Sequence, residues 1–185
     1  MKTTQYLAEI LKELNRSIDF ISDDDAEKLV NDILESNKVF VAGAGRSGFM
    51  AKSFVMRMMH MGIDAYIIGE TVTPNFEKGD ILILATGSGE TKSLVAIAEK
   101  AKAIGGTIAA VTIFPSSTIG QLADYTIAMP GSPKDQSDGV YSTIQPMGSL
   151  FEQTLLLFFD SLILRFMEKN GLDTNKMYGK HANLE

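Results

Sequence analysis

The feature that most constrains the fold of this chain is an apolar run that ends in a glycine-rich turn, at residues 81–91. The run reads ILIL, and the turn after it, ATGSGET, contains two glycines and three hydroxyl side chains. A short continuous apolar run before such a turn is typical of a strand that is buried on both faces of a parallel sheet. A helical pattern begins at Thr91, so this part of the chain predicts a strand–loop–helix unit.

The turn itself has the composition of an anion-binding loop. Glycines allow backbone amides to approach a ligand closely, and the following helix directs its positive end at the same point. An anion with several oxygens, most simply a phosphate, would suit this arrangement. The alternative is a structural loop, in which the hydroxyls cap the helix and the glycines form a tight turn. The candidate binding residues are Thr86, Gly87, Ser88, Gly89 and Thr91.

A second glycine-rich loop follows an earlier predicted strand. Residues 38–42 (KVFVA) form this strand, and the sequence GAGRSG follows at residues 43–48. Gly45, Arg46 and Ser47 lie near the entry to the next predicted helix, so they are further candidates for binding the same anion. Two loops of this kind favour a ligand site more strongly than one.

The second loop also matches the GxGxxG motif of dinucleotide-binding proteins, through Gly43, Gly45 and Gly48. This motif is weak on its own. Dinucleotide-binding folds also place an acidic residue about 20 positions further on, at the end of the next strand. Only Asp64 is available, and it stands at the start of that strand, so the sequence supports this alternative poorly.

The order of the predicted elements indicates a three-layer α/β/α sandwich around a five-stranded parallel sheet, because strands alternate with helices along the chain. In such sheets ligands bind beyond the carboxyl ends of the strands, where both loops lie. We expect a single domain over residues 1–185. Its predicted parts are N-terminal helices at 1–36, a sheet core at 38–129 with strands at 38–42, 64–68, 81–84, 107–113 and 124–129, helices at 49–61, 91–104 and 119–123, an apolar helix at 147–170 and a tail at 171–185.

The composition excludes several classes of protein. The chain has 185 residues, 45% hydrophobic and 22% charged, as expected of a globular protein, and its net charge of −6 argues against nucleic acid as the main partner. The absence of cysteine excludes disulfides, thiolate nucleophiles and zinc–thiolate sites. The N-terminus is amphipathic and charged rather than signal-like, and no apolar run reaches membrane-spanning length. We therefore expect a cytoplasmic protein without a membrane partner.

Two further residues are candidates for chemistry. Glu152 lies in the first turn of the apolar helix, next to a long polar loop at residues 130–145 that is suited to the edge of a site. It is either a favourable partner of the helix dipole or a general base. His181 lies in the polar tail and matters only if the tail folds over a cleft. The other histidine, His60, is on a methionine-rich helix, where we expect core or interface packing.

Four motifs together resemble the sugar isomerase (SIS) domain family: GAGRSG, TGSGET, GSLFEQ and the terminal HANLE. More narrowly they resemble its 6-phospho-3-hexuloisomerases, from the ribulose monophosphate route of formaldehyde fixation and detoxification. The resemblance covers nearly the whole chain and implies a flavodoxin-like fold. It also implies interconversion of D-arabino-hex-3-ulose 6-phosphate and D-fructose 6-phosphate through an enediolate, without a cofactor or a metal.

The resemblance also implies roles for the candidate residues. Glu152 matches the family's catalytic glutamate, and His181 is similar to a histidine that helps to move protons between sugar oxygens, from its own or a neighbouring subunit. Arg46 would stabilise enediolate or phosphate charge, or form a surface salt bridge. Because SIS proteins form dimers and tetramers, the resemblance implies a homo-oligomer. Two alternatives stay open: another SIS isomerase, acting on an arabinose or heptose phosphate, and a non-catalytic sugar-phosphate sensor.

Overall fold

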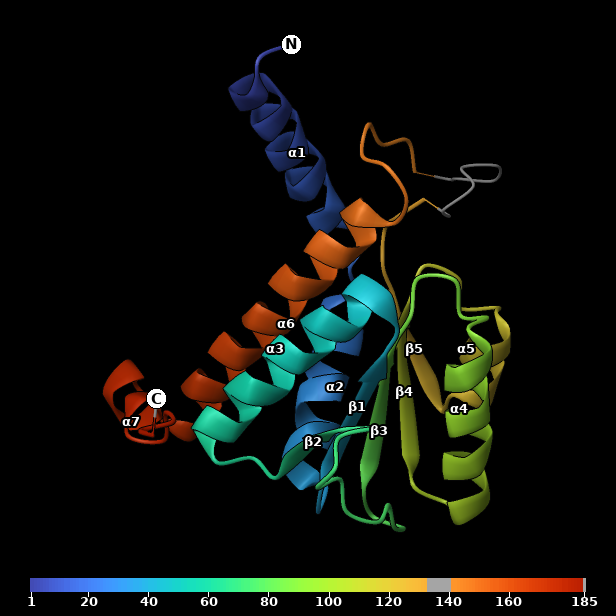
Figure 1. Ribbon diagram of the computed structural model, residues 1–185, viewed down its shortest axis with the longest axis vertical. Coiled ribbons are helices and arrows are strands. Elements are labelled where there is room, and N and C mark those ends of the chain that lie inside the picture. Colours follow the sequence, from blue (N-terminus) through green and yellow to red (C-terminus); the bar gives the residue numbers. More distant parts are fainter. Residues whose placement is uncertain (133–140, 185) are drawn as a thin grey trace.

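The computed structural model describes residues 1–132 and 141–184, and it contains five strands and seven α-helices among them (Figure 1). Part of the predicted polar loop at 130–145 lies outside the described residues. The elements in chain order are α1 (Thr3–Ser17), the short 3-10 helix η1 (Ile18–Phe20), α2 (Asp23–Glu35), β1 (Val39–Gly43), α3 (Gly45–Met61), β2 (Ala65–Ile67), β3 (Ile81–Ala85), α4 (Lys92–Ile104), β4 (Thr107–Thr112), α5 (Thr118–Leu122), β5 (Tyr125–Ala128), α6 (Ser149–Asn170) and α7 (Thr174–Tyr178).

The five strands form one parallel sheet in the order β2-β1-β3-β4-β5. The chain first moves outward from β1 to β2, then crosses back over β1 to β3 and continues in the opposite direction. The strand order therefore reverses between β1 and β3, which is where such sheets bind ligands. The predicted five-stranded parallel sheet is confirmed, and the two glycine-rich turns leave from these two adjacent strands.

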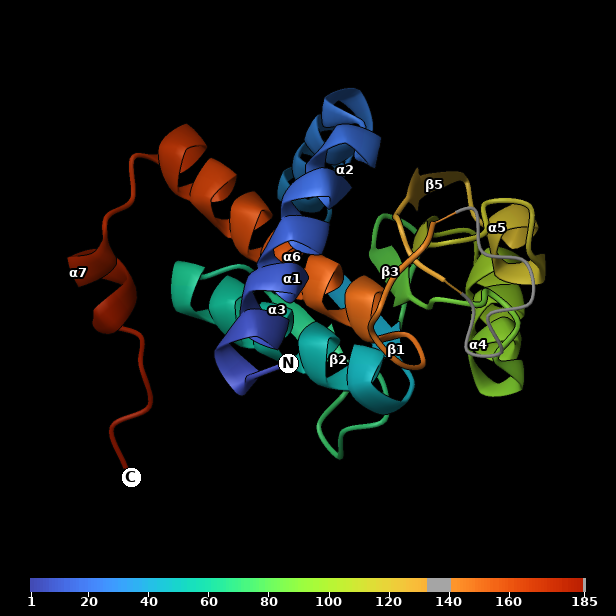
Figure 2. The same ribbon diagram turned by 90° about the horizontal axis from the view of Figure 1, so that it is seen from above.

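Successive residues of the central strands enter two separate hydrophobic cores. Val41 and Ile83 face the core shared with α2, α3 and α6, whereas Phe40, Leu82 and Leu84 face the core shared with α4 and α5. Viewed from above, α4 and α5 cover one face of the sheet, and α2, α3 and α6 lie on the other side (Figure 2). This arrangement confirms the three-layer sandwich, and it explains why these strands are apolar at every position.

The apolar helix α6 packs against α3 through aromatic side chains. Phe54 of α3 and Phe159 of α6 are stacked with their ring centroids 4.2 Å apart, and both are almost fully buried. Complete burial of an aromatic or aliphatic side chain of this size contributes roughly 1.5–3 kcal/mol. Helix α3 begins within the glycine-rich turn GAGRSG, and α6 begins near the same edge of the sheet (Figure 1). This packing therefore fixes the two helix starts relative to each other.

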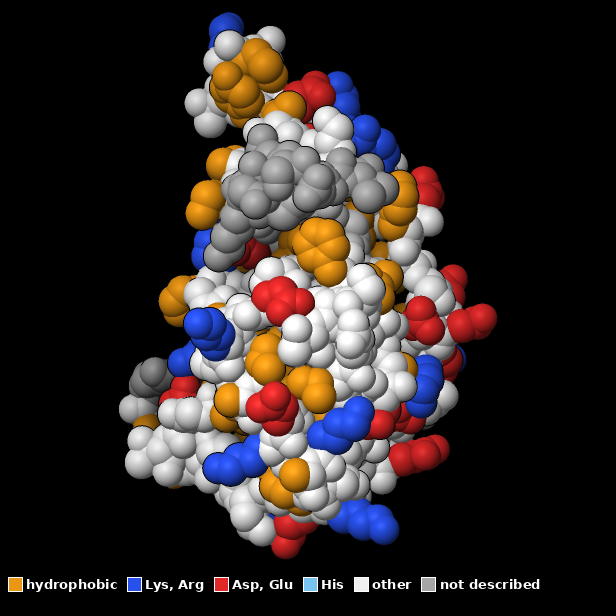
Figure 3. All heavy atoms as spheres, turned by 90° about the vertical axis from the view of Figure 1, so that its right-hand side faces the viewer, with side chains coloured by type: hydrophobic (Ala, Val, Ile, Leu, Met, Phe, Trp, Pro, Cys, Tyr) orange, Lys and Arg blue, Asp and Glu red, His pale blue; other side chains and the backbone are white. Residues whose placement is uncertain are grey.

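The N-terminal helix α1 crosses α6, which it contacts, and extends beyond the sheet (Figure 1). It is amphipathic, as the sequence predicts, but several of its large apolar side chains remain exposed in the single chain. The face in Figure 3 carries a cluster of apolar side chains at the tip of this helix, while elsewhere on that face acidic and basic side chains are interspersed. The exposed apolar residues of this region are Tyr6, Leu7, Leu11, Ile18 and Phe20.

The remaining boundaries agree with the sequence to within a few residues, with two differences. Helix α3 begins at Gly45 instead of about residue 49, so most of GAGRSG belongs to the helix rather than to a loop. The tail contains a short helix, α7, that the sequence analysis did not predict. No helix in the described part of the chain is long and apolar enough to cross a membrane.

The acidic triplet at residues 23–25 forms the first turn of α2. The hydroxyl of Ser22 accepts a hydrogen bond from the backbone amide of Asp25 at 3.2 Å, which is the usual geometry of a helix cap. Within residues 1–132 and 141–184, no group of three acidic or histidine side chains is arranged to hold a metal ion.

Candidate functional site

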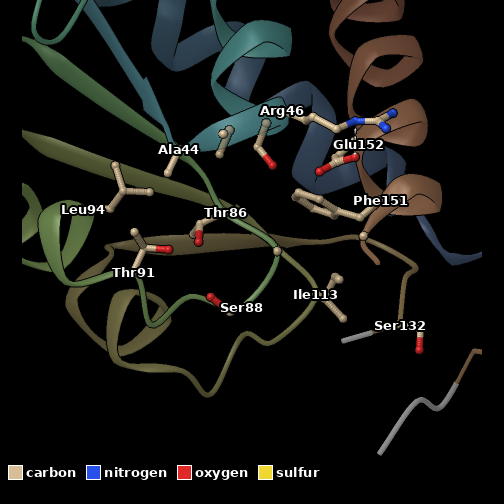
Figure 4. A pocket seen from close by; sticks show the side chains of 15 residues that line it. Ala44, Arg46, Thr86, Ser88, Thr91, Leu94, Ile113, Ser132, Phe151 and Glu152 are labelled. Atoms are coloured by element: carbon tan, nitrogen blue, oxygen red, sulfur yellow. Dashed lines mark ion pairs between the residues drawn. The ribbon is translucent and has the colours of Figure 1, made fainter. Parts of the chain in front are cut away.

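A cavity of about 470 Å³ lies beyond the carboxyl ends of β1 and β3, at the point where the strand order reverses (Figure 4). It takes residues from both glycine-rich turns, from the segments after β4 and β5, and from the first turn of α6. The residues that line it are Ala44, Gly45, Arg46, Ser47, Ala85, Thr86, Gly87, Ser88, Thr91, Leu94, Ile113, Ser132, Gly148, Phe151 and Glu152.

The phosphate-loop candidates from the sequence meet in this cavity, with one exception. Thr86, Gly87, Ser88 and Thr91 line one side (Figure 4). Gly89 is not among the lining residues, because its amide is turned inward and donates a hydrogen bond to the Thr86 hydroxyl at 3.1 Å. Gly89 therefore shapes the loop, while Thr86, Ser88 and Thr91 line the cavity.

The hydroxyl groups of Ser88 and Thr91 differ in the hydrogen bonds that they form within the loop. The Ser88 hydroxyl accepts a hydrogen bond from the backbone amide of Glu90 at 3.2 Å. Thr91 is the N-cap residue of α4, yet its side chain makes no capping hydrogen bond. Its hydroxyl therefore stays available at the positive end of the helix, where an anion is stabilised by the helix dipole and by the free amides of the first turn.

The loop is held in place from behind by the short helix α5. The carboxylate of Glu90 accepts hydrogen bonds from both the amide (2.8 Å) and the hydroxyl (2.7 Å) of Thr118. The amide of Ile119 donates to the Gly89 carbonyl at 3.0 Å. The hydrogen bonds from Thr118 hold the pKa of Glu90 below its ordinary value, and the bond from the Thr118 amide contributes more than the bond from its hydroxyl. Glu90, to which the sequence pattern assigned no role, thus anchors the loop that presents Ser88 and Thr91.

In the other turn, GAGRSG, helix α3 begins earlier than the sequence predicts, because Gly43 and Gly48 lie in close contact. A Cβ atom on Gly48 would lie 2.7 Å from the Gly43 carbonyl oxygen, and one on Gly43 would lie 3.0 Å from the Gly48 amide nitrogen. Glycine at both positions allows the last residue of β1 to contact the first turn of α3 directly. The helix can therefore begin at once, and its first turn presents Arg46 and the buried Ser47 to the cavity.

Opposite the phosphate-loop candidates, the cavity contains an ion pair. Arg46 Nε lies 2.7 Å from Glu152 Oε2, and Figure 4 shows the two side chains pointing toward each other from α3 and α6. The Glu152 side chain is 11% exposed and that of Arg46 is 59% exposed, so the carboxylate faces the cavity while the guanidinium reaches the solvent. The salt bridge considered for Arg46 does exist, and its partner is the candidate base.

The second candidate for catalysis, His181, is not in this cavity. It stacks on His60 with ring centroids 5.2 Å apart, beside the C-terminal end of α3. Arg46 and His60 are fourteen residues apart on α3, which corresponds to about 21 Å along the helix axis. His60 is buried, in agreement with its predicted packing role, and burial lowers its pKa, with smaller contributions from Arg57 and His181. Within one chain, His181 and Glu152 thus lie at opposite ends of α3.

The apolar wall of the cavity was not predicted from the sequence. Ile113 follows β4, Leu94 comes from α4, and Phe151 precedes Glu152 on α6. Ser132 and Gly148 complete the rim. Ser132 belongs to the polar loop at 130–145 that was expected at the edge of a site, and Phe151 stands inside the GSLFEQ motif. Nothing in the local sequence marks Ile113.

A parallel α/β sandwich with this cavity defines a class of protein: one that binds a small anionic ligand beyond the strand ends and holds a carboxylate against it. The donors at one end of the cavity suit a phosphate, while the carboxylate and the apolar wall face the rest of the ligand.

Comparison with known proteins identifies the family. The SIS domain family model matches residues 32–157, and the chain belongs to this family. It is 61% identical, over the whole length of both chains, to a 3-hexulose-6-phosphate isomerase of Bacillus subtilis. It is also 39% identical to a 3-hexulose-6-phosphate isomerase of Methanocaldococcus jannaschii, over 85% of this chain and 83% of that one.

A solved structure agrees with these relatives. The crystal structure of a hypothetical protein from Methanococcus jannaschii, from which a molecular function of 3-hexulose-6-phosphate isomerase was inferred, matches with a TM-score of 0.84 at 34% identity. The match covers 98% of this chain and 99% of that one. The fold and the family expected from the four motifs are thereby confirmed.

Proposed function

We propose that this chain is a cofactor-independent isomerase that interconverts D-arabino-hex-3-ulose 6-phosphate and D-fructose 6-phosphate. The observation that carries the proposal is the position of Glu152, which faces the same cavity as two phosphate-binding turns. The identity of 61% with an isomerase of this name supports the choice of sugar.

The two turns would hold the phosphate and so orient the sugar. Ser47, Ser88 and Thr91 offer hydroxyls, and the start of α4 offers amides and the positive end of its dipole. A phosphate held at that end extends the carbon chain toward α6, where Glu152 lies. Fixing one end of the substrate in this way reduces the entropic cost of bringing the reacting carbon to the base.

The chemistry needs one base and one stabiliser of negative charge. The carboxylate of Glu152 takes the proton from C2 of the 3-ketose, and the C2–H electron pair forms the C2=C3 bond of an enediolate while the C3 carbonyl oxygen takes the negative charge. In the second half the proton is returned to C3, and the C2 oxygen, having given up its proton to the C3 oxygen, becomes the new carbonyl. Arg46, 2.7 Å from Glu152, is placed to stabilise the enediolate charge.

The proton that passes between the two sugar oxygens requires a second group, and His181 is our candidate. Because His181 lies at the far end of α3 in its own chain, we propose that it acts in the cavity of a neighbouring subunit. This requires a homo-oligomer, either a dimer or a tetramer. Large apolar side chains that remain exposed in the single chain offer surface for such an assembly: Phe49, Met56 and Met59 on α3, and Leu157 and Leu164 on α6.

The remaining parts of the proposal concern location and partners. We propose a cytoplasmic protein, because its doubly charged substrate does not cross membranes unaided and has to be made and consumed in the same compartment. The acidic balance of the chain, with a net charge of −6, is unfavourable for binding the phosphate backbone of nucleic acids.

The proposal is tested by following a panel of sugar phosphates by NMR with the purified protein. We expect fructose 6-phosphate to equilibrate with the 3-hexulose 6-phosphate, and arabinose 5-phosphate and heptose phosphates to remain unchanged. Conversion of a different sugar alone would indicate another isomerase of this family. Thermal stabilisation by fructose 6-phosphate without conversion of any sugar would indicate a sensor, and either result would overturn the proposal.

A further inference from the structure

A buried carboxylate outside the cavity, that of Glu13 on α1, binds the segment that leads into α6. The Glu13 residue is 7% exposed, although it belongs to a helix that lies mostly at the surface. Its Oε1 accepts a hydrogen bond from the Ile144 amide (2.8 Å), and its Oε2 accepts from the Thr143 hydroxyl (2.7 Å) and the Gln145 side-chain amide (2.9 Å). Three consecutive residues therefore donate to one carboxylate.

Other contacts attach the same segment to α1. The Tyr141 hydroxyl donates to the Glu13 carbonyl at 3.4 Å, and the Tyr141 ring meets Phe20 edge-on at 5.1 Å. The guanidinium of Arg16 lies over the Tyr141 ring and donates to the Ser142 carbonyl at 3.4 Å. Residues 141–145 are thus held along their whole length by one face of α1.

This segment determines where α6 begins. Only three residues separate Gln145 from Ser149, the first residue of α6, and the Ser149 amide donates to the Pro146 carbonyl at 3.2 Å. Between them Met147 has a φ of +61°, the one positive value among the described non-glycine residues. A side chain in that region costs free energy and persists only where the surroundings impose it. Gly148 then lines the cavity, and its carbonyl accepts from the Glu152 amide at 3.0 Å.

A charge is present at Glu13 because the segment stabilises it. Burial alone would raise the pKa of Glu13, but the hydrogen bonds from Thr143, Gln145 and Ile144, with the nearby Arg16, outweigh it and hold this pKa below its ordinary value. Hydrogen bonds to a charged acceptor are shorter and stronger than neutral ones. They therefore fix one conformation of the segment, which apolar packing of α1 would not do.

We propose that Glu13 is a positioning residue for Glu152: by holding residues 143–145 it fixes the first turn of α6, and so the catalytic carboxylate, relative to the phosphate-binding turns. The proposal rests on the isomerase function proposed above. The contact between Glu13 and the segment spans about 130 positions of sequence, and it joins α1 to an edge of the cavity that α1 itself does not line.

The test compares Glu13→Gln with Glu9→Gln. Both substitutions remove one negative charge from α1, but the Glu9 side chain is 41% exposed and pairs only with Lys12 at 2.6 Å among the described residues. In Glu13→Gln the three donors lose their charged acceptor, because the substituted side chain is neutral. Its amide group also faces the side-chain amide of Gln145. Displacement of a catalytic group by about 1 Å can cost on the order of 100-fold in rate. We expect kcat to fall at least about 10-fold with KM changed less than about 3-fold, because the phosphate turns are untouched.

Hydrogen exchange of the Ile144 amide provides a second readout that does not depend on activity. We expect exchange of peptides spanning 141–152 to accelerate in Glu13→Gln and to match the unchanged protein in Glu9→Gln. Accelerated exchange with kcat equal to that of Glu9→Gln would overturn the positioning role, as would unchanged exchange. A rise in KM equal to the fall in kcat would overturn it too, because the phosphate turns would then be disturbed.

The two proposals fail in distinguishable ways. If the unchanged protein converts no 3-hexulose 6-phosphate, the isomerase proposal fails, and the exchange data still report whether Glu13 holds the segment. If the unchanged protein is active and Glu13→Gln is equally active, only the positioning role fails.

Discussion

Arg46 and Glu152 meet across the cavity with 2.7 Å between Nε and Oε2, although they come from the first turns of two helices more than one hundred residues apart. The pairing holds a carboxylate at a defined place opposite the turn at residues 86–91, which we propose binds the phosphate. It also places a positive charge where an enediolate oxygen would develop its negative charge. One ion pair thus contains the proposed base and the group that would stabilise the enediolate, whereas the proton transfer between the sugar oxygens needs a further group.

Replacing Glu152 by glutamine removes the proposed base and keeps its shape. We expect the variant to fold normally and to lose roughly 100-fold or more in kcat, the usual contribution of a general base. Incorporation of solvent deuterium into fructose 6-phosphate, followed by NMR, measures the proton abstraction directly. Asp160→Asn, which changes an exposed carboxylate on the same helix, is the control. Activity of Glu152→Gln near that of this control would remove Glu152 from the role.

A subunit-mixing experiment tests whether His181 acts in a neighbour. Glu152→Gln and His181→Asn are each expected to be nearly inactive. When the two are co-expressed, half of the sites in each mixed dimer combine an intact Glu152 with an intact His181, so about a quarter of full activity should return. If the histidine served its own chain, every site would lack one group and the mixture would stay inactive.

The hydroxyls of Ser47 and Thr91 should contribute to binding rather than to chemistry. A hydrogen bond to a charged group is worth about 1.5–3 kcal/mol, so Ser47→Ala or Thr91→Val should weaken phosphate binding by about 10- to 100-fold and raise KM accordingly. Titration calorimetry with fructose 6-phosphate measures the loss. Ser53→Ala is the matched control, because this hydroxyl lies on α3 and donates to the Met50 carbonyl instead. Equal affinities in all three variants would contradict the assignment.

The sequence predicted the parts of the site that depend on local pattern. Apolar runs followed by glycine-rich turns identify strands and their carboxyl ends, and in a parallel sheet those ends share one edge. The meeting of Ser47 with Thr91 in one cavity follows from this reasoning. The position of Glu152 in a first helical turn was equally visible, because the polar loop ends and the apolar helix begins just before it.

The parts that the sequence did not predict depend on contacts between distant segments. Glu13 looks like any acidic residue of a surface helix until the segment at 141–145 folds against it. The early start of α3 follows from the contact between Gly43 and Gly48, which no helix propensity describes. The pairing of His181 with His60 is likewise a tertiary contact, between the tail and the end of α3.

Gly89 should tolerate no side chain, and its replacement should affect both stability and binding. Its φ is +67°, and a Cβ atom there would lie 1.8 Å from the Ser117 hydroxyl oxygen. Gly105 is the matched control: its φ is +92°, but a Cβ atom there would meet nothing within 4 Å. Gly105→Ala should cost about 1 kcal/mol, or about 2–4 °C in Tm for a chain of this size. Gly89→Ala should lower Tm further and, unlike the control, weaken phosphate binding.

Acid should weaken the attachment of α2 to α6 through Glu27. Hydrogen bonds from Arg165 and then Lys169 lower the pKa of Glu27 from 4.5 to about 2. A group whose pKa is lower in the folded state stabilises that state fully above its unfolded value, and the stabilisation disappears as the pH falls through the folded value. The free energy of unfolding should therefore exceed that of Glu27→Gln by a constant amount above about pH 5, and this excess should shrink as the pH falls toward 2.

Urea unfolding at a series of pH values measures this excess, and other carboxylates that titrate in the same range cancel in the difference between the two proteins. Glu35→Gln is the control on the same helix, because Glu35 is exposed and has no ion-pair partner in the described part of the chain. Since salt screens exposed ion pairs, added sodium chloride should reduce the excess at neutral pH as well. A difference between Glu27→Gln and the unchanged protein that stayed constant down to pH 2 would show that the contacts with Arg165 and Lys169 do not stabilise the fold.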